Sequence, residues 1–469
     1  MNAIDALMSS LQGSVVLSGE RVTVKDEAKL HTRFDALVEE AVFGDSEAQA
    51  MARWLIWEIA QALGIRPASI HDLYIARGRG AIARRFTVPA INLRMMTYDS
   101  ARAVFRAARN ANVGALIFEI ARSEIGYTDQ RPAEYASVVL GAAIQEGHRG
   151  PVFIQGDHFQ VSAKAHAANA EGEMKKVREL TAEAIAAGFY NIDIDTSTLV
   201  DLSKPTTYEQ QRTNFELCAD LTRYARQNQP EGITISLGGE IGEVGGKNSS
   251  EEELRAFMDG YRASLNGATG ISKISIQTGT SHGGVVLPDG TLADVAIDFD
   301  VLRRLGAVAR AEYGLGGAVQ HGASTLPETA FGKFVECEAV EVHLATAFQT
   351  LVMDHASIPQ TLRDEIREWL FANAADERKA KDTDEQFVYK TRKKAIGPFK
   401  RRFWTLPDEA RMSIGMALEA RFMFLFEQLG VRDSAHDVDA FVRTIEMHRP
   451  IPTGAVAAAQ TESVEGLAD

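Results

Sequence analysis

Short apolar runs and amphipathic windows alternate along the middle of the chain, from Phe86 to about His355. The runs are rich in β-branched residues and have the length of buried strands. Eight such runs occur, at 86–93, 115–120, 152–157, 191–195, 234–240, 273–278, 317–321 and 339–345. Between them, apolar residues recur at the i, i+3, i+4, i+7 spacing of helices. The pattern predicts eight strands, each followed by a helix.

Two windows illustrate the predicted helices. YDSARAVFRAARNAN has Asp99 or Ser100 as its candidate N-cap, and DFDVLRRLGAVARAEY has Asp298 in its first turn. Strands separated by helices pair in parallel through right-handed crossovers, and eight such units match a closed barrel. We therefore expect an α/β fold, a (β/α)8 TIM barrel with N- and C-terminal helical extensions. An open doubly wound sheet is the alternative, because closure cannot be seen in a sequence.

The flanking segments have a different pattern. One helical window near the N-terminus, SEAQAMARWLIWEIAQALG, has an apolar face that includes Trp54 and Trp57. We expect this face to pack on the barrel or on a neighbouring subunit. The last residues are small and polar and are predicted to be disordered. The predicted organisation is an N-terminal helical extension (1–85), a barrel (86–355), a C-terminal helical extension (356–448) and a disordered tail (449–469).

Composition narrows the class of protein. The chain has 469 residues, 45% of them hydrophobic and 24% charged, which is typical of globular proteins. A net charge of -14 argues against an extended nucleic-acid surface. No signal peptide and no apolar stretch of membrane-spanning length is visible, so we expect a cytoplasmic protein without a membrane partner. The two cysteines, Cys218 and Cys337, have no metal-binding spacing and are predicted to be buried thiols.

Polar side chains gather where the predicted strands end. The carboxyl ends of barrel strands carry the functional site in TIM barrels. Six of the eight strands or the turns after them contribute an acid or a histidine: Asp157 and His158, Asp195, Glu240, His282, His321 and His343. A polar group at the end of a buried strand costs stability unless something binds it. We therefore expect these side chains to form one site.

Three of these histidines suggest a metal. His158, His282 and His321 follow separate strands, and three converging ligands with an open fourth position are typical of a catalytic divalent ion, most naturally zinc. A lone histidine is more often a hydrogen-bonded structural residue. Three at equivalent strand ends, with carboxylates between them, favour the metal.

Glycine-rich turns and a basic run leave two interpretations each. GEIGEVGG, GTSHGG and HGAS offer backbone N–H groups that bind anions, although each alone reads as an ordinary turn. KTRKKAIGPFKRR, residues 390–402, is either a solvated face or an element that grips a phosphate over the rim of a site, its own or that of a neighbouring subunit.

These motifs, in this order, resemble the class II (metal-dependent) fructose-bisphosphate and tagatose-bisphosphate aldolases. The resemblance covers about residues 86–355, and it rests on VPAIN, GDH, DTS, GEIGEVGG, GTSHG, DFDVLRRL and HGAS. It implies that His158, His282 and His321 bind zinc and that Asp157 is the catalytic acid and base. It also implies that Glu240 and Asp195 hold the metal in an alternative position. The substrate-binding residues it implies are Gly283, Gly322, Ser324, His343, Thr346, Ser123 and Asn92.

The chain also departs from the family pattern. His343 stands where the family usually has Asn, and the loop KNSSEEE leaves Glu251 to Glu253 as candidates for a second proton carrier. The serine usual after the second strand is displaced, with Ser123 close by. The stretch EIARSEIGYTDQRPAEY is more similar to the non-catalytic companion subunit of tagatose-bisphosphate aldolase. The chain is thus similar to a divergent branch of the family.

The resemblance implies an enzyme, a zinc-dependent aldolase. It would cleave or condense a fructose- or tagatose-bisphosphate-like ketose phosphate through a metal-stabilised enediolate, giving dihydroxyacetone phosphate and an aldehyde. Zn²⁺ is the expected cofactor, with Co²⁺ or Mn²⁺ as alternatives and a monovalent cation as a further one. The expected partners are a small sugar phosphate and, in a homo-oligomer, further copies of the chain. Two alternatives stay open, a non-catalytic companion subunit and a metal-dependent sugar-phosphate epimerase or isomerase.

Overall fold

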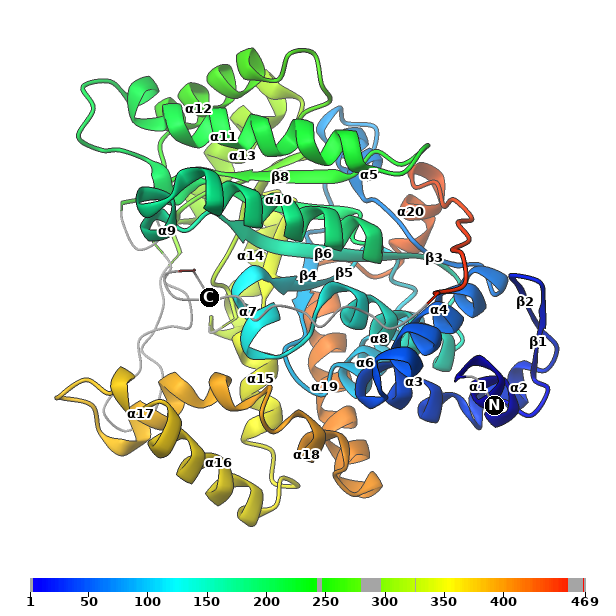
Figure 1. The fold of residues 1–469 in the computed structure, drawn as a ribbon. Helices are drawn as coiled ribbons and strands as arrows, with labels where there is room; N and C mark the ends of the chain where they lie inside the picture. Colours follow the sequence, from blue (N-terminus) through cyan, green and yellow to red (C-terminus); the bar gives the residue numbers. More distant parts are fainter. Residues whose placement is uncertain (1–2, 243–246, 280–296, 325, 454–466, 468–469) are drawn as a thin grey trace.

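Eight parallel strands form the centre of the molecule (Figure 1). The computed structural model describes residues 3–242, 247–279, 297–324, 326–453 and 467. The barrel strands are β4 (Val88–Asn92), β5 (Ile117–Ala121), β6 (Gly150–Gln160), β7 (Asn191–Asp195), β8 (Ser236–Glu240), β9 (Lys273–Ser275), β10 (Ala318–Gln320) and β11 (Glu341–Leu344). β4 pairs with both β5 and β11, and β6 pairs with β7, so the sheet closes on itself. The predicted TIM barrel is confirmed, and the open sheet is excluded.

Helices cover the outside of the barrel, which explains why the strands read as continuous apolar runs. Apart from the first two residues of β6, every residue of the eight strands is buried. The covering helices include α6 (Thr97–Asn110), α8 (Pro132–Gln145), α10 (Ala170–Ala187), α11 (Thr207–Asn228), α12 (Glu251–Ser264), α13 (Phe299–Tyr313) and α14 (Phe331–Glu336). The main core therefore lies inside the barrel and between it and this layer.

The eighth outer helix comes from far along the chain. α19 (Asp408–Gln428) packs against α6 and α14, although the sequence pattern placed residues 356–448 in an extension. Arg106 of α6 donates to Glu419 of α19 at 2.7 Å, and the Phe348 and Phe422 rings lie 5.0 Å apart. Part of the C-terminal segment thus completes the outer layer of the barrel.

Two predicted helix starts are corrected. α6 begins at Thr97, and its N-cap position is Met96 with φ 45°, so neither Asp99 nor Ser100 caps it. Asp99 lies in the first turn and pairs with Arg411 of α19 at 2.9 Å, a tertiary contact that the local pattern does not reveal. Asp298 is the N-cap of α13 rather than a residue of its first turn, and it accepts from Asp300 N and Val301 N.

The N-terminal segment packs on one side of the barrel. It comprises α1 (Ala3–Ser10), β1 (Val15–Ser18), β2 (Arg21–Val24), α2 (Glu27–His31), α3 (Phe34–Phe43), α4 (Ser46–Ala62), β3 (Ile65–Pro67) and α5 (His71–Gly78). β3 pairs with the first residues of β6 and extends the sheet there. α4 contacts α3 and α8. This segment is therefore fixed to the barrel by strand pairing as well as by helix packing.

The tryptophans of α4 are covered by the chain's own C-terminal segment. Trp54 donates to Arg449 O at 2.9 Å, and Trp57 donates to Met447 O at 2.7 Å. The sequence pattern placed Arg449 in the disordered tail, but its guanidinium lies over the Trp57 ring. The tail residues 454–466, 468 and 469 lie outside the described residues. Because this apolar face is buried within one chain, it gives no reason to expect an oligomer, which stays a prediction.

A C-terminal lobe projects beside α7 (Arg122–Tyr127) in Figure 1. It follows α15 (Thr346–Met353) and contains α16 (Gln360–Asn373), α17 (Asp384–Thr391), the short 3-10 helix η4 (Arg392–Ala395) and α18 (Lys400–Trp404). η4 contacts α7, which directly follows β5. The lobe therefore reaches the end of the barrel where the strands finish. α20 (Ala435–Phe441) returns to pack on α5.

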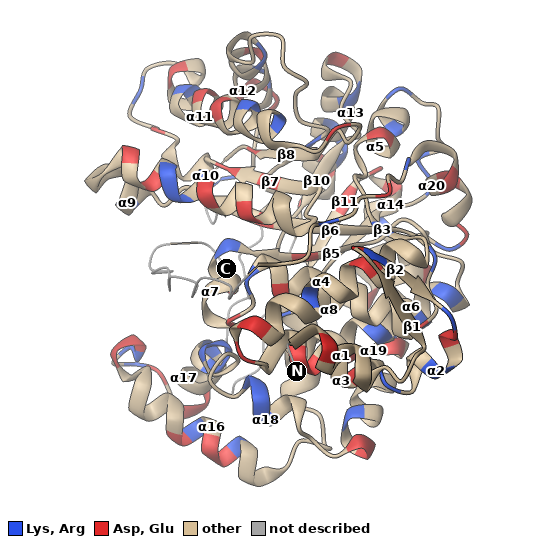
Figure 2. Cartoon of the chain, turned by 45° about the vertical axis from the view of Figure 1, so that its right-hand side comes forward, with Lys and Arg blue, Asp and Glu red and all other residues tan. Residues whose placement is uncertain are grey.

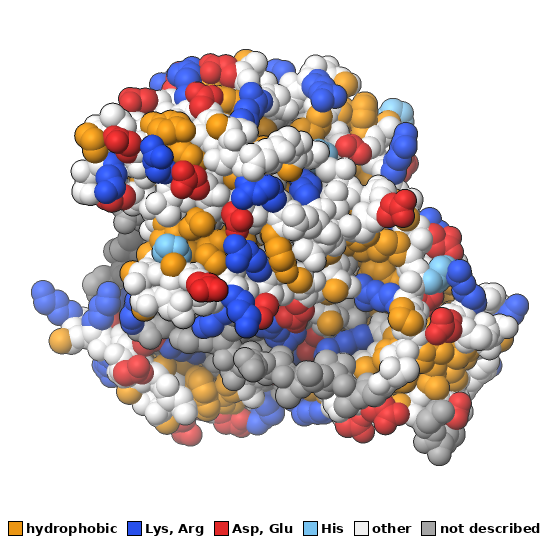
Figure 3. Space-filling model, turned by 45° about the horizontal axis from the view of Figure 1, so that its top comes forward, with side chains coloured by type: hydrophobic (Ala, Val, Ile, Leu, Met, Phe, Trp, Pro, Cys, Tyr) orange, Lys and Arg blue, Asp and Glu red, His pale blue; other side chains and the backbone are white. Residues whose placement is uncertain are grey.

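Charges of both signs are mixed over the outer helices. Lys and Arg alternate with Asp and Glu in Figure 2, and the face seen in Figure 3 has no continuous basic area.

Both cysteines are free and buried, as predicted. Within the described part of the chain, no helix is long and apolar enough to cross a membrane.

Candidate metal centre

A bulge in β6 places Asp157 and His158 in the same site. The strand does not end at Asp157, as the sequence pattern suggested, but continues to Gln160. Its pairing with β7 shifts between Gly156 and Phe159, and His158 has φ 40°. Successive side chains of a regular strand point to opposite faces, and a bulge changes that alternation. Both side chains consequently reach His321: Asp157 Oδ1 lies 3.3 Å from His321 Nε2, and the His158 and His321 rings are 4.3 Å apart.

Glycine at position 156 is part of this arrangement. A Cβ atom there would lie 2.4 Å from the Phe159 ring, which folds back against the bulge. Any larger residue would push the ring away. The Gly-Asp-His sequence is thus explained by backbone geometry as well as by the chemistry of its side chains.

His158, Glu240 and His321 form a group that could hold a metal ion. Each offers a ligand atom, and these atoms lie within 4.8 Å of one another. His158 Nδ1 is 3.3 Å from Glu240 Oε2. The three residues come from β6, from the end of β8 and from the residue after β10, and all three are buried. His282, the third predicted histidine, lies outside the described residues, as does Gly283.

Asp195 supports His158. Its Oδ1 accepts from Ser197 N at 3.0 Å and Ser197 Oγ at 2.7 Å, and its Oδ2 lies 3.3 Å from His158 Nδ1. Oδ2 also accepts from Gln160 Nε2 at 2.5 Å. Burial opposes ionisation, but these hydrogen bonds outweigh it and lower the pKa of Asp195 to about 2. Asp195 is thus a fixed negative charge whose oxygens are already occupied.

The surroundings of Glu240, unlike those of Asp195, oppose ionisation. Burial and the nearby charge of Asp195 raise the pKa of Glu240 to about 7. Its Oε1 is buried and has no hydrogen-bond partner among the described residues. Within that same part of the chain, the only ion-pair partners of Asp157, Asp195 and Glu240 are histidines. This donor set therefore fits a divalent cation, which would supply the missing positive charge.

A second group, Asp157, Asp193, His321 and His343, also satisfies the distance criterion for a metal. Asp193, however, is already paired with Lys273, whose Nζ lies 2.9 Å from its Oδ1. A divalent ion there would meet an ammonium group at close range. The group of His158, Glu240 and His321 is the better candidate.

A layer of buried polar and charged residues lies beneath the metal centre. We call it the charged floor, and it consists of Tyr74, Glu119, Gln155, Asp193, Lys273 and Glu341. On three strands, a floor residue stands two positions before a residue of the site: Gln155 before Asp157 on β6, Asp193 before Asp195 on β7, and Glu341 before His343 on β11. Each floor residue therefore faces the barrel interior one layer below its partner. Lys273 Nζ donates to Gln155 Oε1 at 2.8 Å and pairs with Asp193 and Glu341. Tyr74 donates to Glu341.

His343 connects the two layers. Its Nδ1 is 2.9 Å from Glu119 and 3.2 Å from Asp157, and its Nε2 is 2.7 Å from Glu341. Burial alone would lower the pKa of His343, but these carboxylates raise it well above its ordinary value. His343 is therefore a buried imidazolium directly below Asp157.

The remaining predicted residues lie in two places on the rim. Ser324 Oγ accepts from Ala345 N at 2.6 Å, beside Thr346, the first residue of α15, and Gly322 has φ 70° in the turn after β10. Asn92 is instead the last residue of β4, and Ser123 is the second residue of α7, which directly follows β5. Glu251 to Glu253 begin α12, where Glu253 accepts from Ser250 N at 2.7 Å as part of a capping box.

The charged floor was missed by the sequence analysis. Lys273 opens the run KISIQT and Glu341 lies in AVEVHLA, and we interpreted both runs as apolar strands. The available signal is spacing, because Glu341 and His343 are two residues apart and so face the same side of a strand. An inward-facing charge on each of several strands indicates a polar layer inside the barrel.

Comparison with known families decides the relationship. Residues 79–401 match the family model described as fructose-bisphosphate aldolase class-II. The chain belongs to the class II fructose-bisphosphate aldolase family. No curated protein matches its sequence. This membership agrees with the motif order and with the barrel-end position of the metal centre.

Solved structures similar to this member of the class II aldolase family share its fold at low identity. One, described as a probable tagatose 6 phosphate kinase from Sinorhizobium meliloti 1021, is 14% identical, with TM-score 0.53, over 76% of this chain and 99% of that one. Another, a fructuronate-tagaturonate epimerase from Cohnella laeviribosi, is 12% identical, with TM-score 0.54, over 74% and 82%. Such likenesses show the barrel and no more.

Proposed function

We propose that this chain is a divalent-metal-dependent aldolase that cleaves or condenses a ketose phosphate. The observation that carries the proposal is the convergence of His158, Glu240 and His321 with Asp157 beside them, at the barrel end where TIM-barrel sites lie. Family membership supports the reaction class. The sugar, its stereochemistry and the number of its phosphates are to be found by experiment.

The proposed metal ligands are His158, His321 and Glu240, with His282 as a further one. Imidazole nitrogens with one carboxylate suit Zn²⁺, and also Co²⁺ or Mn²⁺. A divalent ion held there would draw negative charge onto the ketose oxygens and so stabilise the enediolate. Asp195 would orient His158, since its own oxygens accept from Ser197 and Gln160.

Asp157 is the proposed catalytic acid and base. Burial would raise its pKa, but in the metal-free protein the charges of His158 and His343 hold the pKa of Asp157 well below its ordinary value. A divalent ion bound by a neutral His158 would supply positive charge in place of that histidine. The carboxylate is therefore ionised at neutral pH, and it can accept the proton of a substrate hydroxyl in cleavage and return it in condensation. His343, beneath it, would keep it oriented from 3.2 Å away.

The structure does not favour a Schiff base at the buried lysine. A lysine nucleophile must be neutral, and desolvation would favour that form of Lys273. Its contacts with Asp193 and Glu341 outweigh burial and raise the pKa of Lys273 instead. Lys273 is thus a charged member of the floor, and the metal centre stays the proposed site of chemistry.

Two rim regions are the proposed substrate contacts. Gly322, Ser324 and Thr346, with Gly283, would hold a phosphate through backbone and hydroxyl groups near α15. Asn92 and Ser123 would contact the rest of the sugar. His343, also predicted to bind substrate, would act on it through Asp157, because both of its ring nitrogens face carboxylates. A phosphate near Ser324 and a carbonyl near His321 would be neighbours, because these residues are three positions apart.

A product assay tests the proposal. Metal-free protein is supplied with Zn²⁺, Co²⁺ or Mn²⁺ and incubated with fructose 1,6-bisphosphate and tagatose 1,6-bisphosphate, and triose phosphate release is measured with chelator and Asp157→Ala controls. Metal-dependent triose release supports the aldolase. A new ketose isomer without trioses would favour an epimerase, the activity named for one structural neighbour. No reaction and no metal uptake would favour the companion subunit.

A further inference from the structure

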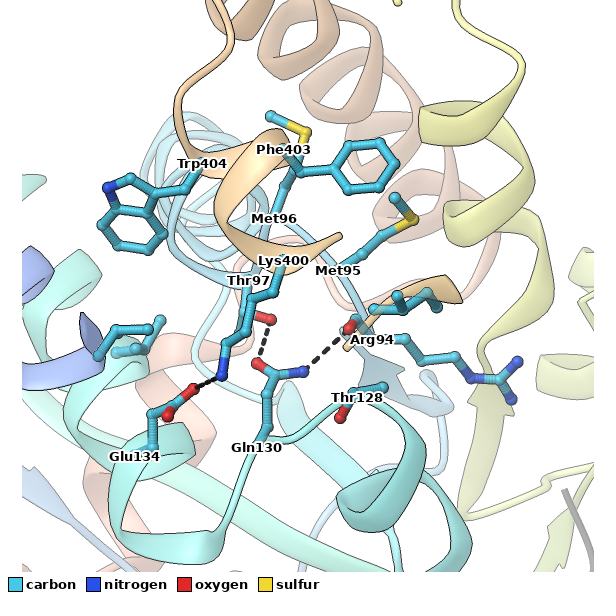
Figure 4. A pocket seen from close by; sticks show the side chains of 13 residues that line it. Arg94, Met95, Met96, Thr97, Thr128, Gln130, Glu134, Lys400, Phe403 and Trp404 are labelled. Carbon is cyan, nitrogen blue, oxygen red and sulfur yellow. Dashed lines mark hydrogen bonds and ion pairs between the residues drawn. The ribbon is translucent and has the colours of Figure 1, made fainter. Parts of the chain in front are cut away.

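Buried polar side chains outside the metal centre include those around the pocket beside α18 in Figure 4. Lys400 pairs there with Glu134. Thr97 donates to Gln130 at 2.6 Å, and Gln130 in turn donates to the backbone oxygen of Arg94 at 2.9 Å. These groups satisfy one another within the pocket. The contacts of the charged floor differ, because they continue into the metal centre.

Tyr74 brings the N-terminal segment into the floor. It is buried and lies on α5, which packs against the amino ends of the barrel strands. Ile70 N, at the start of α5, donates to the side chain of Asn191, the first residue of β7, at 2.9 Å. A Cβ atom on Gly316, two residues before β10, would lie 2.9 Å from Tyr74 Cβ. Tyr74 thus enters the barrel from the end opposite the metal centre, and it precedes the residues 79–401 that match the family model.

One carboxylate oxygen of Glu341 depends on Tyr74. Glu341 Oε1 accepts from Gln155 at 3.1 Å, from His343 Nε2 at 2.7 Å and from Lys273. Glu341 Oε2, in contrast, accepts only from the Tyr74 hydroxyl within the described part of the chain. Burial and the charge of Glu341 raise the pKa of Tyr74 well above its ordinary value, so the hydroxyl stays a neutral donor. Tyr74 therefore fixes the second oxygen of Glu341 and with it the plane of the carboxylate.

Glu341 in turn orients the ring of His343. With Nε2 held by Glu341, His343 Nδ1 lies 2.9 Å from Glu119 Oε2 and 3.2 Å from Asp157 Oδ1. The two N–H groups of an imidazolium lie in the ring plane, so a ring fixed at one nitrogen directs the other to a fixed point. The other ion-pair partners of Asp157 among the described residues are the two histidines proposed to bind the metal. His343 is thus the partner that can orient Asp157 when the metal is bound.

We propose that Tyr74 is a positioning residue for Asp157 and acts on it through Glu341 and His343. This inference rests on the proposed function, in which Asp157 is the acid and base. A carboxylate that loses its alignment with the substrate hydroxyl transfers the proton more slowly, although the substrate still binds. The N-terminal segment then serves the reaction through α5, even though α5 lies outside the part of the chain that matches the family.

Steady-state kinetics of the full-length protein with its metal test the proposal. Tyr74→Phe removes only the hydroxyl group. The matched control is Tyr261→Phe, which removes a buried hydroxyl that shares a hydrogen bond with Thr222 at 2.9 Å between the outer helices α11 and α12. We expect Tyr74→Phe to lower kcat about 10-fold, with KM and metal content within about 2-fold of the wild type, and Tyr261→Phe to change kcat less than about 2-fold. A purely structural role would lower the stability of both variants and leave kcat per folded chain unchanged.

A double-mutant cycle tests the route through His343. If Tyr74 acts through His343, Tyr74→Phe should change kcat less than about 2-fold in a His343→Asn background. A loss of about 10-fold in that background as well, or a normal kcat in Tyr74→Phe alone, would overturn the proposal. Circular dichroism checks the fold, and Glu341→Gln takes the place of Tyr74→Phe in the cycle should that variant not fold.

Crystal structures without substrate separate this proposal from the aldolase proposal. We expect the Asp157 carboxylate to move by about 0.5 Å or more, or to occupy two positions, in Tyr74→Phe and to stay in place in Tyr261→Phe. An unmoved Asp157 in Tyr74→Phe would overturn the positioning role. A wild type that releases no triose would remove the aldolase, and a displaced Asp157 would still support the positioning role. An active wild type with full activity in Tyr74→Phe would remove only the positioning role.

Discussion

The metal centre and the charged floor bury similar side chains one layer apart, but they balance charge differently. In the floor, Lys273 pairs with Asp193 and Glu341. In the metal centre, histidines are the only ion-pair partners of Asp157, Asp195 and Glu240 within the described part of the chain. Buried carboxylates require a partner of opposite charge. The floor contains its cation as a side chain, whereas the donor set of the metal centre could hold a divalent ion, and we infer the site of chemistry from this difference.

Removing the cation of the floor should give the largest effect. Lys273→Met leaves Asp193 and Glu341 buried without their partner, which we expect to cost about 3–5 kcal/mol of unfolding free energy. Urea denaturation measures it. Lys175→Met is the control, since Lys175 is largely exposed on α10 and should change stability by less than about 0.5 kcal/mol. A Lys273→Met protein as stable as the wild type would mean that the floor does not depend on its lysine.

Removing the carboxylate beside the proposed metal ligands should affect rate rather than stability. Asp157→Ala is expected to keep its metal and to lower kcat about 100-fold or more, which corresponds to about 2.7 kcal/mol. Steady-state kinetics and elemental analysis are compared with those of Asp439→Ala, whose side chain is exposed on α20. Normal turnover in Asp157→Ala would remove that residue from the mechanism.

The pH dependence of stability should separate the two layers further. The pKa of Glu240 is raised to about 7 in the fold, from an ordinary value near 4.5. Between these values the folded protein holds more protons than the unfolded chain, so stability is present at low pH and is lost as pH rises through 7. In the presence of a metal chelator, the unfolding free energy of Glu240→Gln relative to that of the wild type should therefore rise by about 2 kcal/mol between pH 5 and pH 8.

Glu231→Gln is the matched control for this pH series, because Glu231 is exposed. Denaturation at a series of pH values measures the difference from the wild type. We expect added Zn²⁺ to prevent the loss of wild-type stability at high pH and to have no such effect on Glu240→Gln. A difference that stays flat from pH 5 to pH 8 would show that Glu240 is not an isolated buried carboxylate.

The sequence predicted the parts of this comparison that depend on local pattern. All eight strands follow from mainly apolar runs, because helices cover the outer face of each strand, although inward-facing residues of the floor interrupt these runs. Asp157, His158, Asp195, Glu240 and His321 were found because a polar residue at the end of such a run breaks the pattern. The bulge in β6 was not found, since Gly156 followed by Asp157 is also typical of a turn.

Features that depend on contacts between distant segments could not be predicted in this way. The floor requires the register of β6, β7, β9 and β11, which a single strand does not contain. α19 follows the lobe of α16 to α18, so chain order does not reveal that it packs against α6. Likewise, the contact between Tyr74 and Glu341 results from tertiary packing between residues 267 positions apart.

Metal content tests the central claim most directly. The purified wild type, His321→Ala and His436→Ala are analysed by elemental mass spectrometry, with the exposed His436 as the control. We predict about one zinc or similar ion per chain in the wild type and in His436→Ala, and its loss in His321→Ala. A wild type that neither contains nor takes up Zn²⁺ or Co²⁺, or a His321→Ala protein that keeps its metal, would contradict the account.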